Sequence, residues 1–157
     1  MQRSGRKWDL IFVDTYRQPS IPAHLATAEF FAEVEECLTP GGIAVLNVHA
    51  SFEPGPVVEG LARTWLDVFP DAQRVEGPDQ GGFSSRLYLA RQGGGAVEAP
   101  LELMEKMPRM LQPAWHMIAS NLEPLPEPSK GRVWTDNHVP VEVLTERAER
   151  RLRAELQ

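Results

Sequence analysis

The segment Trp8-Asp9-Leu10-Ile11-Phe12-Val13-Asp14 constrains the fold of this chain more than any other. After one acid it continues as an unbroken apolar run, which is typical of a strand buried on both faces inside a parallel sheet. Asp14 follows where this strand should end. Open α/β sheets bind ligands outside the carboxyl ends of their strands. A carboxylate that leaves such a strand is therefore our first candidate for chemistry.

The residues that follow predict a strand-helix-strand unit. Apolar side chains recur at helical spacing from Phe30 to Leu38, with Thr27 as the predicted N-cap. The run Thr39-Pro40-Gly41-Gly42 is expected to end this helix, and residues 43–48 form a second apolar strand. Short joints between parallel strands and a helix predict a right-handed crossover.

A second helix and a hairpin complete the predicted sheet. A helix with one apolar stripe is predicted to begin at Pro56 and to end at Pro70. Short strands are expected around 73–75 and 85–90. Because Gly and Pro residues turn the chain between those two strands, we expect them to pair as a hairpin. The predicted class is α/β, with a sheet of mixed parallel and antiparallel strands over residues 1–92.

Residues 93–157 are predicted to be a Gly/Pro-rich linker and a helical extension. Gly93-Gly94-Gly95 lacks the Gly-Lys-Ser/Thr pattern of a phosphate loop and is interpreted as a linker. Pro residues divide 100–122 into two expected short helical pieces, and 122–129 is expected to be an extended loop. The last helix is predicted from about 141 to 156.

Composition limits the function classes. The chain has 157 residues, 42% hydrophobic and 24% charged, with a net charge of -6. This is a globular composition without the basic surface that nucleic acids or anionic membranes need. Cys37 is the one cysteine, which fits a reducing, cytoplasmic location. The four histidines lack metal-ligand spacing, so we expect no metal site.

Several motifs together resemble the C-terminal half of a spermidine synthase-like (polyamine aminopropyltransferase-like) protein. They are the segment Trp8 to Asp14, Ile21-Pro22, Glu29-Phe30-Phe31 and Leu38-Thr39-Pro40-Gly41-Gly42. The segment from Trp134 to His138, with Pro140-Val141-Glu142, also resembles a C-terminal motif of bacterial members. The resemblance implies a partial Rossmann-like class I methyltransferase fold. It also implies a transferase that uses S-adenosylmethionine or decarboxylated S-adenosylmethionine.

By this resemblance, Asp14 takes the position of a carboxylate that faces both the donor and the attacking amine, and it would act as the base. Alternatively, Asp14 caps its own loop through backbone amides. The same loop supplies the predicted substrate-binding residues Tyr16, Arg17, Gln18 and His24. His24 either reaches the crevice beside Asp14 or lies in solvent.

Arg17 departs from the family pattern, because spermidine synthases carry a second acid at this position to hold the polyamine. A guanidinium opposes a substrate ammonium, which argues against a diamine. Arg17 either binds a carboxylate or phosphate or pairs with a Glu on the surface.

A second predicted group lies near the C-terminus. Asp136, Asn137 and Glu142 are candidates for a flap that closes over the ligand crevice. The alternative for Asp136 and Asn137 is an Asx-type turn that leads into the last helix.

The first three strands of the family, with their glycine-rich turn, have no counterpart in this sequence. We therefore expect a separated or truncated half, which forms a homodimer or pairs with a separate N-terminal half. The expected function is a spermidine synthase-like transferase, or its C-terminal half, with Asp14 as base. The alternatives are a non-catalytic remnant that acts as an association module and a methyltransferase that acts on a small molecule.

Overall fold

The computed structural model describes residues 5–14, 21–51, 55–77, 83–141, 143–147 and 150. These residues form a five-stranded sheet of order β1-β2-β4-β3-β5, in which β1 and β2 are parallel and the other pairs are antiparallel. The strands are β1 (Trp8–Val13), β2 (Leu38–Ser51), β3 (Gln73–Glu76), β4 (Phe83–Arg91) and β5 (Glu123–Pro124). The α/β class with a mixed sheet is therefore confirmed.

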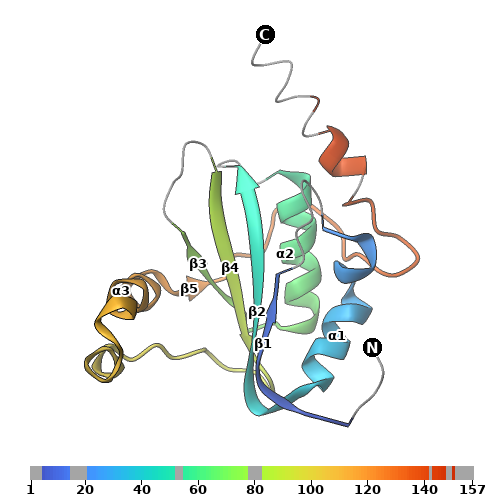
Figure 1. The fold of residues 1–157 in the computed structure, drawn as a ribbon. Helices are drawn as coiled ribbons and strands as arrows, with labels where there is room; N and C mark the ends of the chain where they lie inside the picture. Colours follow the sequence, from blue (N-terminus) through green and yellow to red (C-terminus); the bar gives the residue numbers. More distant parts are fainter. Residues whose placement is uncertain are drawn as a thin grey trace.

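Helices lie on both sides of this sheet. Figure 1 shows α1 (Ala28–Glu36) and α2 (Pro56–Val68) on one side and α3 (Gln112–Asn121) on the other. The 3-10 helices are η1 (Ala23–Leu25), η2 (Leu101–Lys106) and η3 (Arg109–Leu111). The segment 100–122 thus has three helical pieces where two were predicted. Pro113 does not interrupt α3, because it lies in the first turn, where a helix needs no backbone donor.

The predicted strand-helix-strand unit is present. The Thr27 Oγ1 atom accepts a hydrogen bond of 3.1 Å from the amide of Phe30, which confirms the N-cap of α1. The predicted joint before the second strand is different, because residues 39–42 belong to β2. Trp8 lies opposite Leu38 but Leu10 lies opposite Ile43, so these residues form an irregularity in the register, where Gly41 has a φ of +77°.

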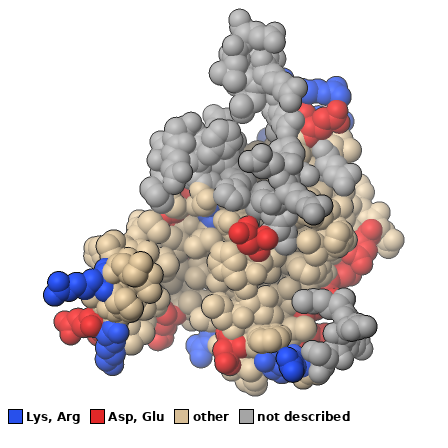
Figure 2. All heavy atoms as spheres, in the orientation of Figure 1, with Lys and Arg blue, Asp and Glu red and all other residues tan. Residues whose placement is uncertain are grey.

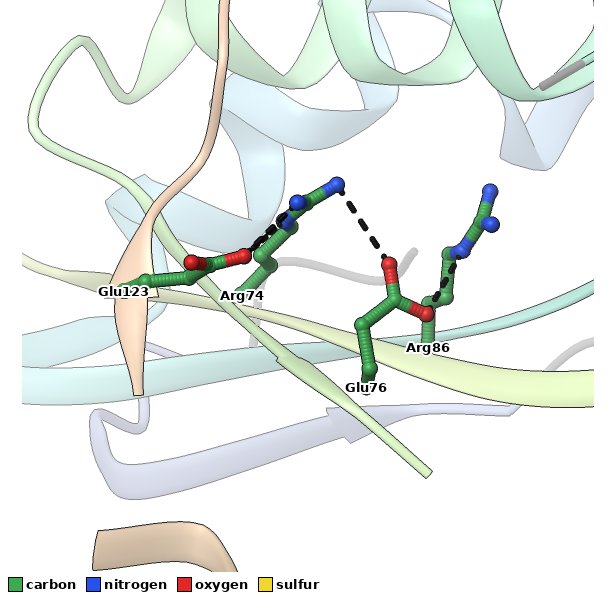
Figure 3. A network of polar contacts seen from close by, with 4 residues as sticks. All are labelled: Arg74, Glu76, Arg86 and Glu123. Atoms are coloured by element: carbon green, nitrogen blue, oxygen red, sulfur yellow. Dashed lines mark hydrogen bonds and ion pairs between the residues drawn. The ribbon is translucent and has the colours of Figure 1, made fainter. Parts of the chain in front are cut away.

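The predicted hairpin of β3 and β4 is also confirmed, with Val75 opposite Leu87. The segment 122–129 was expected to be only a loop, yet Glu123 and Pro124 pair with the outer edge of β3. Figure 3 shows how ion pairs accompany this pairing. The Arg74 guanidinium contacts Glu123 at 2.6 Å and Glu76 at 3.3 Å, and Glu76 contacts Arg86 at 2.9 Å.

One prediction about β1 is wrong: the strand is not buried on both faces. Ile11 and Val13 point toward the core beneath α1 and α2, whereas Trp8, Leu10 and Phe12 are exposed on the opposite face. β1 lies at the edge of the sheet, and α3 packs over β3 instead. An apolar run therefore formed the strand, but the described residues cover only one of its faces.

The main core lies between the sheet and α1 and α2. Edge-to-face packing joins Phe31 to Trp65, whose ring centroids are 4.9 Å apart, and Trp65 also contacts Phe69. Leu125, Trp134 and Val141 belong to the same buried cluster. The C-terminal segment therefore packs on the side of the sheet that α1 and α2 cover.

Candidate functional site

Asp14 lies at the carboxyl end of the parallel strand pair, where the sequence placed it. Val13 and Leu46 are opposite one another in β1 and β2, so Asp14 and Asn47 follow them side by side. The Asn47 Nδ2 atom donates a hydrogen bond of 3.2 Å to Asp14 Oδ1. Asp14 is exposed. This contact orients the carboxylate from a neighbouring strand while solvent or a ligand can still reach it.

A cleft of 710 Å³ lies beside the start of α1. Three predicted site residues line it. His24 comes from η1, and Asp136 and Asn137 come from the C-terminal segment, which is distant from η1 in sequence. The full lining of the cleft consists of Ala23, His24, Leu25, Thr27, Glu29, Phe30, Glu33, Asp136, Asn137 and Val139. The structure thus brings two separate predictions into one cleft, but Asp14 is not among the lining residues.

Backbone contacts hold the C-terminal segment against the start of α1. The amide of Ala28 donates to the carbonyl of Trp134 at 2.8 Å, and the amide of Asp136 donates to Glu29 Oε2 at 3.1 Å. Asp136 and Asn137 occupy the middle of a tight turn that backbone bonds between Thr135 and His138 close. A tight backbone turn is therefore present at these two residues, and it forms one wall of the cleft.

Acidic side chains dominate the charge of the cleft. Glu29, Glu33 and Asp136 contribute carboxylates, and the described lining includes no Lys or Arg. Phe30, Leu25 and Val139 add apolar surface. The sequence singles out Glu29 only within the motif Glu29-Phe30-Phe31 and does not identify Glu33 as a site residue. Their spacing of four residues, which puts both on one face, was the signal that pointed to a shared acidic surface.

Figure 2 shows charges of both signs on the face that it presents, without a continuous basic area among the described residues. Within the described ranges, no group of three or more His, Cys, Asp or Glu side chains is arranged to hold a metal ion. No helix in the described part of the chain is long and apolar enough to cross a membrane. The predicted site residues Tyr16, Arg17, Gln18 and Glu142 lie outside the described residues.

Fold and site together define a partial Rossmann-like α/β chain with an acid at the carboxyl edge of its parallel strands. The fold resembles a crystal structure of a probable spermidine synthase from Corynebacterium glutamicum, with a TM-score of 0.51 and 16% identity. The match covers 80% of this chain and 47% of that one. At this identity the likeness shows the fold alone.

Sequence comparison supports the resemblance to spermidine synthase-like proteins, over only part of the relatives' length. A probable polyamine aminopropyl transferase of Bifidobacterium longum is 30% identical over 155 residues, which cover 90% of this chain and 35% of that protein. A polyamine aminopropyltransferase of Vibrio vulnificus is 30% identical over 86 residues, or 55% of this chain and 27% of that protein. No protein-family model matches the sequence. The chain spans about a third of the length of these curated relatives.

Proposed function

We propose that this chain supplies the acceptor side of a spermidine synthase-like aminopropyl transferase, with Asp14 as its base. The observation that carries the proposal is the Asp14 carboxylate beside Asn47 at the carboxyl edge of two parallel strands. Ligands of open α/β sheets bind at this edge. The names of the curated relatives favour aminopropyl transfer over other chemistry at such an edge.

The proposed chemistry needs a proton acceptor. The nitrogen of the acceptor amine attacks the donor carbon next to the positive sulfur. As the new C–N bond forms, the C–S bond breaks and its electron pair stays on sulfur, which becomes neutral. Asp14 takes the proton that the nitrogen gives up. Positioned bases typically contribute about 10²- to 10⁴-fold to such rates. The bond from Asn47 would hold Asp14 in place for this role.

The donor would be decarboxylated S-adenosylmethionine, which the family uses as a substrate. The described residues fit only part of it. An exposed carboxylate at Asp14 suits a sulfonium or an amine. However, among the described residues no strand is followed by a glycine-rich turn and a helix, the arrangement that holds the nucleotide in such folds. We therefore assign this chain to the acceptor side of the site.

The acceptor would be a cationic amine. The carboxylates of Glu29, Glu33 and Asp136 give the cleft a negative potential that attracts an ammonium group. The apolar surface of Phe30 suits a methylene chain. Arg17 would oppose a second ammonium, so this proposal favours an acceptor with a single charged end.

The association module is the second candidate function, and one observation favours it. Trp8, Leu10 and Phe12 expose apolar surface on an edge strand, which is unusual for a protein that acts alone. This candidate needs no catalytic role for Asp14. A methyltransferase that acts on a small acid would place Arg17 on the carboxylate of its substrate, but no described contact favours it.

The test is an aminopropyl transfer assay of the chain assembled with the rest of the fold. We expect Asp14→Asn, which keeps the shape and removes the base, to lower kcat by about 10²-fold or more. Asp67→Asn is the matched control, because Asp67 is also exposed but lies in the last turn of α2, at the other end of the strands. Full turnover by Asp14→Asn, or no transfer by the assembled wild-type protein, would contradict the proposal.

A further inference from the structure

One face of the sheet carries, along β1, apolar side chains that no described residue covers. Trp8, Leu10 and Phe12 are 51%, 59% and 54% exposed, although all three belong to one regular strand. Side chains alternate along a strand, so these three share a face opposite to the one that α1 and α2 cover. An apolar row of this size on a sheet face typically marks an interface.

Beside β1, the same face is covered on β2, β4 and β3. Phe12 lies beside Val45 in the parallel ladder, and Val45 lies beside Leu89 in β4, so their side chains share this face. On β3 and β4 the face is packed, because Ile118 and Leu122 contact the buried cluster of Val45, Val75 and Leu89. The cover therefore stops before β1. Sheets with parallel strands in α/β proteins are normally covered on both faces.

The outer edge of β1 is equally unprotected. Within the described ranges, β1 pairs with β2 alone. Edge strands usually carry Pro, Lys or inward charges against unwanted pairing, and β1 has neither Pro nor Lys. Its one charge, on Asp9, lies on the same face as Ile11 and Val13 and accepts a hydrogen bond of 2.8 Å from Thr39 Oγ1. The amide of Trp8 points toward β2, so alternation directs the amides of Asp9, Ile11 and Val13 outward.

We propose that this edge and face of β1 dock a second polypeptide of α/β type, which adds a parallel strand to β1 and lays an apolar helix over Trp8, Leu10 and Phe12. The curated relative and the solved structure both contain much more chain than the matched parts, which are 35% and 47% of their lengths. That additional chain is long enough for several strand-helix units. The proposal does not depend on a catalytic role for Asp14.

A second copy of this chain fits the surface less well. Antiparallel pairing of two β1 strands about a two-fold axis perpendicular to the sheet leaves all side chains on their original faces. Both sets of Trp8, Leu10 and Phe12 would then lie on one face, and the bare apolar area would double. A strand followed by a crossover helix instead satisfies the outward amides and covers the face. Its carboxyl end would also lie next to Asp14, at the edge where the site is open.

The probe is the remainder of the Bifidobacterium longum relative, outside the matched segment, produced as a separate polypeptide and mixed with the full chain. Sedimentation should show a 1:1 complex. Hydrogen exchange at the amides of Asp9, Ile11 and Val13 should slow by about tenfold or more on mixing. The match to the relative covers 90% of this chain. The proposal therefore requires the unmatched part of the relative to recognise the β1 surface of this chain.

Substitutions locate the contact. Leu10→Lys and Phe12→Lys should each weaken the complex by about tenfold or more, because each puts a charge into the apolar contact. Leu101→Lys is the matched control, since Leu101 in η2 is 51% exposed and should leave the Kd unchanged. The thermal transition of each variant alone shows that it is folded. No complex, a complex with unchanged exchange in β1, or a defined homodimer that protects β1 would each overturn the proposal.

Discussion

A Cβ atom at Gly60 would lie 2.1 Å from Cζ2 of Trp134. The indole therefore lies directly on the backbone of α2, and it reaches this position only because residue 60 has no side chain. The amide of Trp134 also donates to Thr64 Oγ1 at 3.0 Å, one turn further along α2. Since Trp134 immediately precedes the turn that lines the cleft, its packing on Gly60 positions Asp136 and Asn137.

Replacement of Gly60 by Ala should destabilise the protein. Ala normally favours a helix over Gly by up to about 1 kcal/mol, but here the methyl group overlaps a buried ring. Overpacking of this kind typically costs about 1–3 kcal/mol, so the net effect should be a loss. Chemical denaturation of Gly60→Ala gives the free energy of unfolding. Gly55→Ala is the control, because a Cβ there meets nothing within 4 Å; equal stabilities for the two variants would show that the ring moves aside freely.

Sequence patterns predicted most of the elements of this fold. The N-cap at Thr27, the proline start of α2 and the hairpin near Val75 follow from local chemistry, which acts over a few residues. The position of Asp14 was also predictable, because it depends only on where an apolar strand ends. These features need no knowledge of distant packing.

The remaining features depend on contacts between distant parts of the chain. The sequence from Leu10 to Val13 is equally apolar whether or not another element covers the second face of the strand. The exposure of Leu10 and Phe12 could therefore not be predicted from it. The acidic cleft forms only because Trp134 places Asp136 beside Glu29, and these residues are more than 100 positions apart. Local periodicity contains no information on such a meeting.

Stability at high pH should depend on Tyr88. This side chain is 2% exposed, and burial raises its pKa from 10.0 to about 12, with nearby Glu76 adding to this and Arg86 and Arg74 opposing it. Because the unfolded chain releases the phenolic proton first, folding loses stability as the pH rises from about 10 to about 12. The loss is about 2–3 kcal/mol for a shift of this size. Below pH 10 this group should have no effect.

The measurement compares the wild type with Tyr88→Phe. Phe keeps most of the packing and cannot ionise, so its free energy of unfolding should fall less between pH 10 and pH 12. The difference between the two curves removes the contribution of other groups that titrate in this range. Parallel curves for the two proteins would mean that Tyr88 ionises normally or that solvent reaches it.

The chain by itself should bind the donor poorly. Nucleotide sites of this fold use a glycine-rich turn and the start of the following helix, and the part of the chain that the structure describes contains no such combination after a strand. Titration calorimetry of the chain with S-adenosylmethionine, and separately with its decarboxylated form, should therefore show no micromolar binding. A dissociation constant of a few micromolar for either compound would show that the chain holds the nucleotide in a different way.

Removal of one carboxylate from the cleft should weaken an amine acceptor without slowing the chemical step. Glu33 lines the cleft but lies on α1, away from the carboxyl edge where Asp14 sits, so Glu33→Gln should raise KM for the amine and leave kcat nearly unchanged. One partly screened charge contributes about 1 kcal/mol at contact, or roughly fivefold in KM. Glu36→Gln is the matched control, because Glu36 is an exposed residue of the same helix that does not line the cleft. The assay uses the assembled protein with an amine acceptor that has one charged end and with a neutral acceptor of similar length. If Glu33→Gln and Glu36→Gln give the same KM for the charged acceptor, the acceptor binds outside this cleft and reaches Asp14 from another surface.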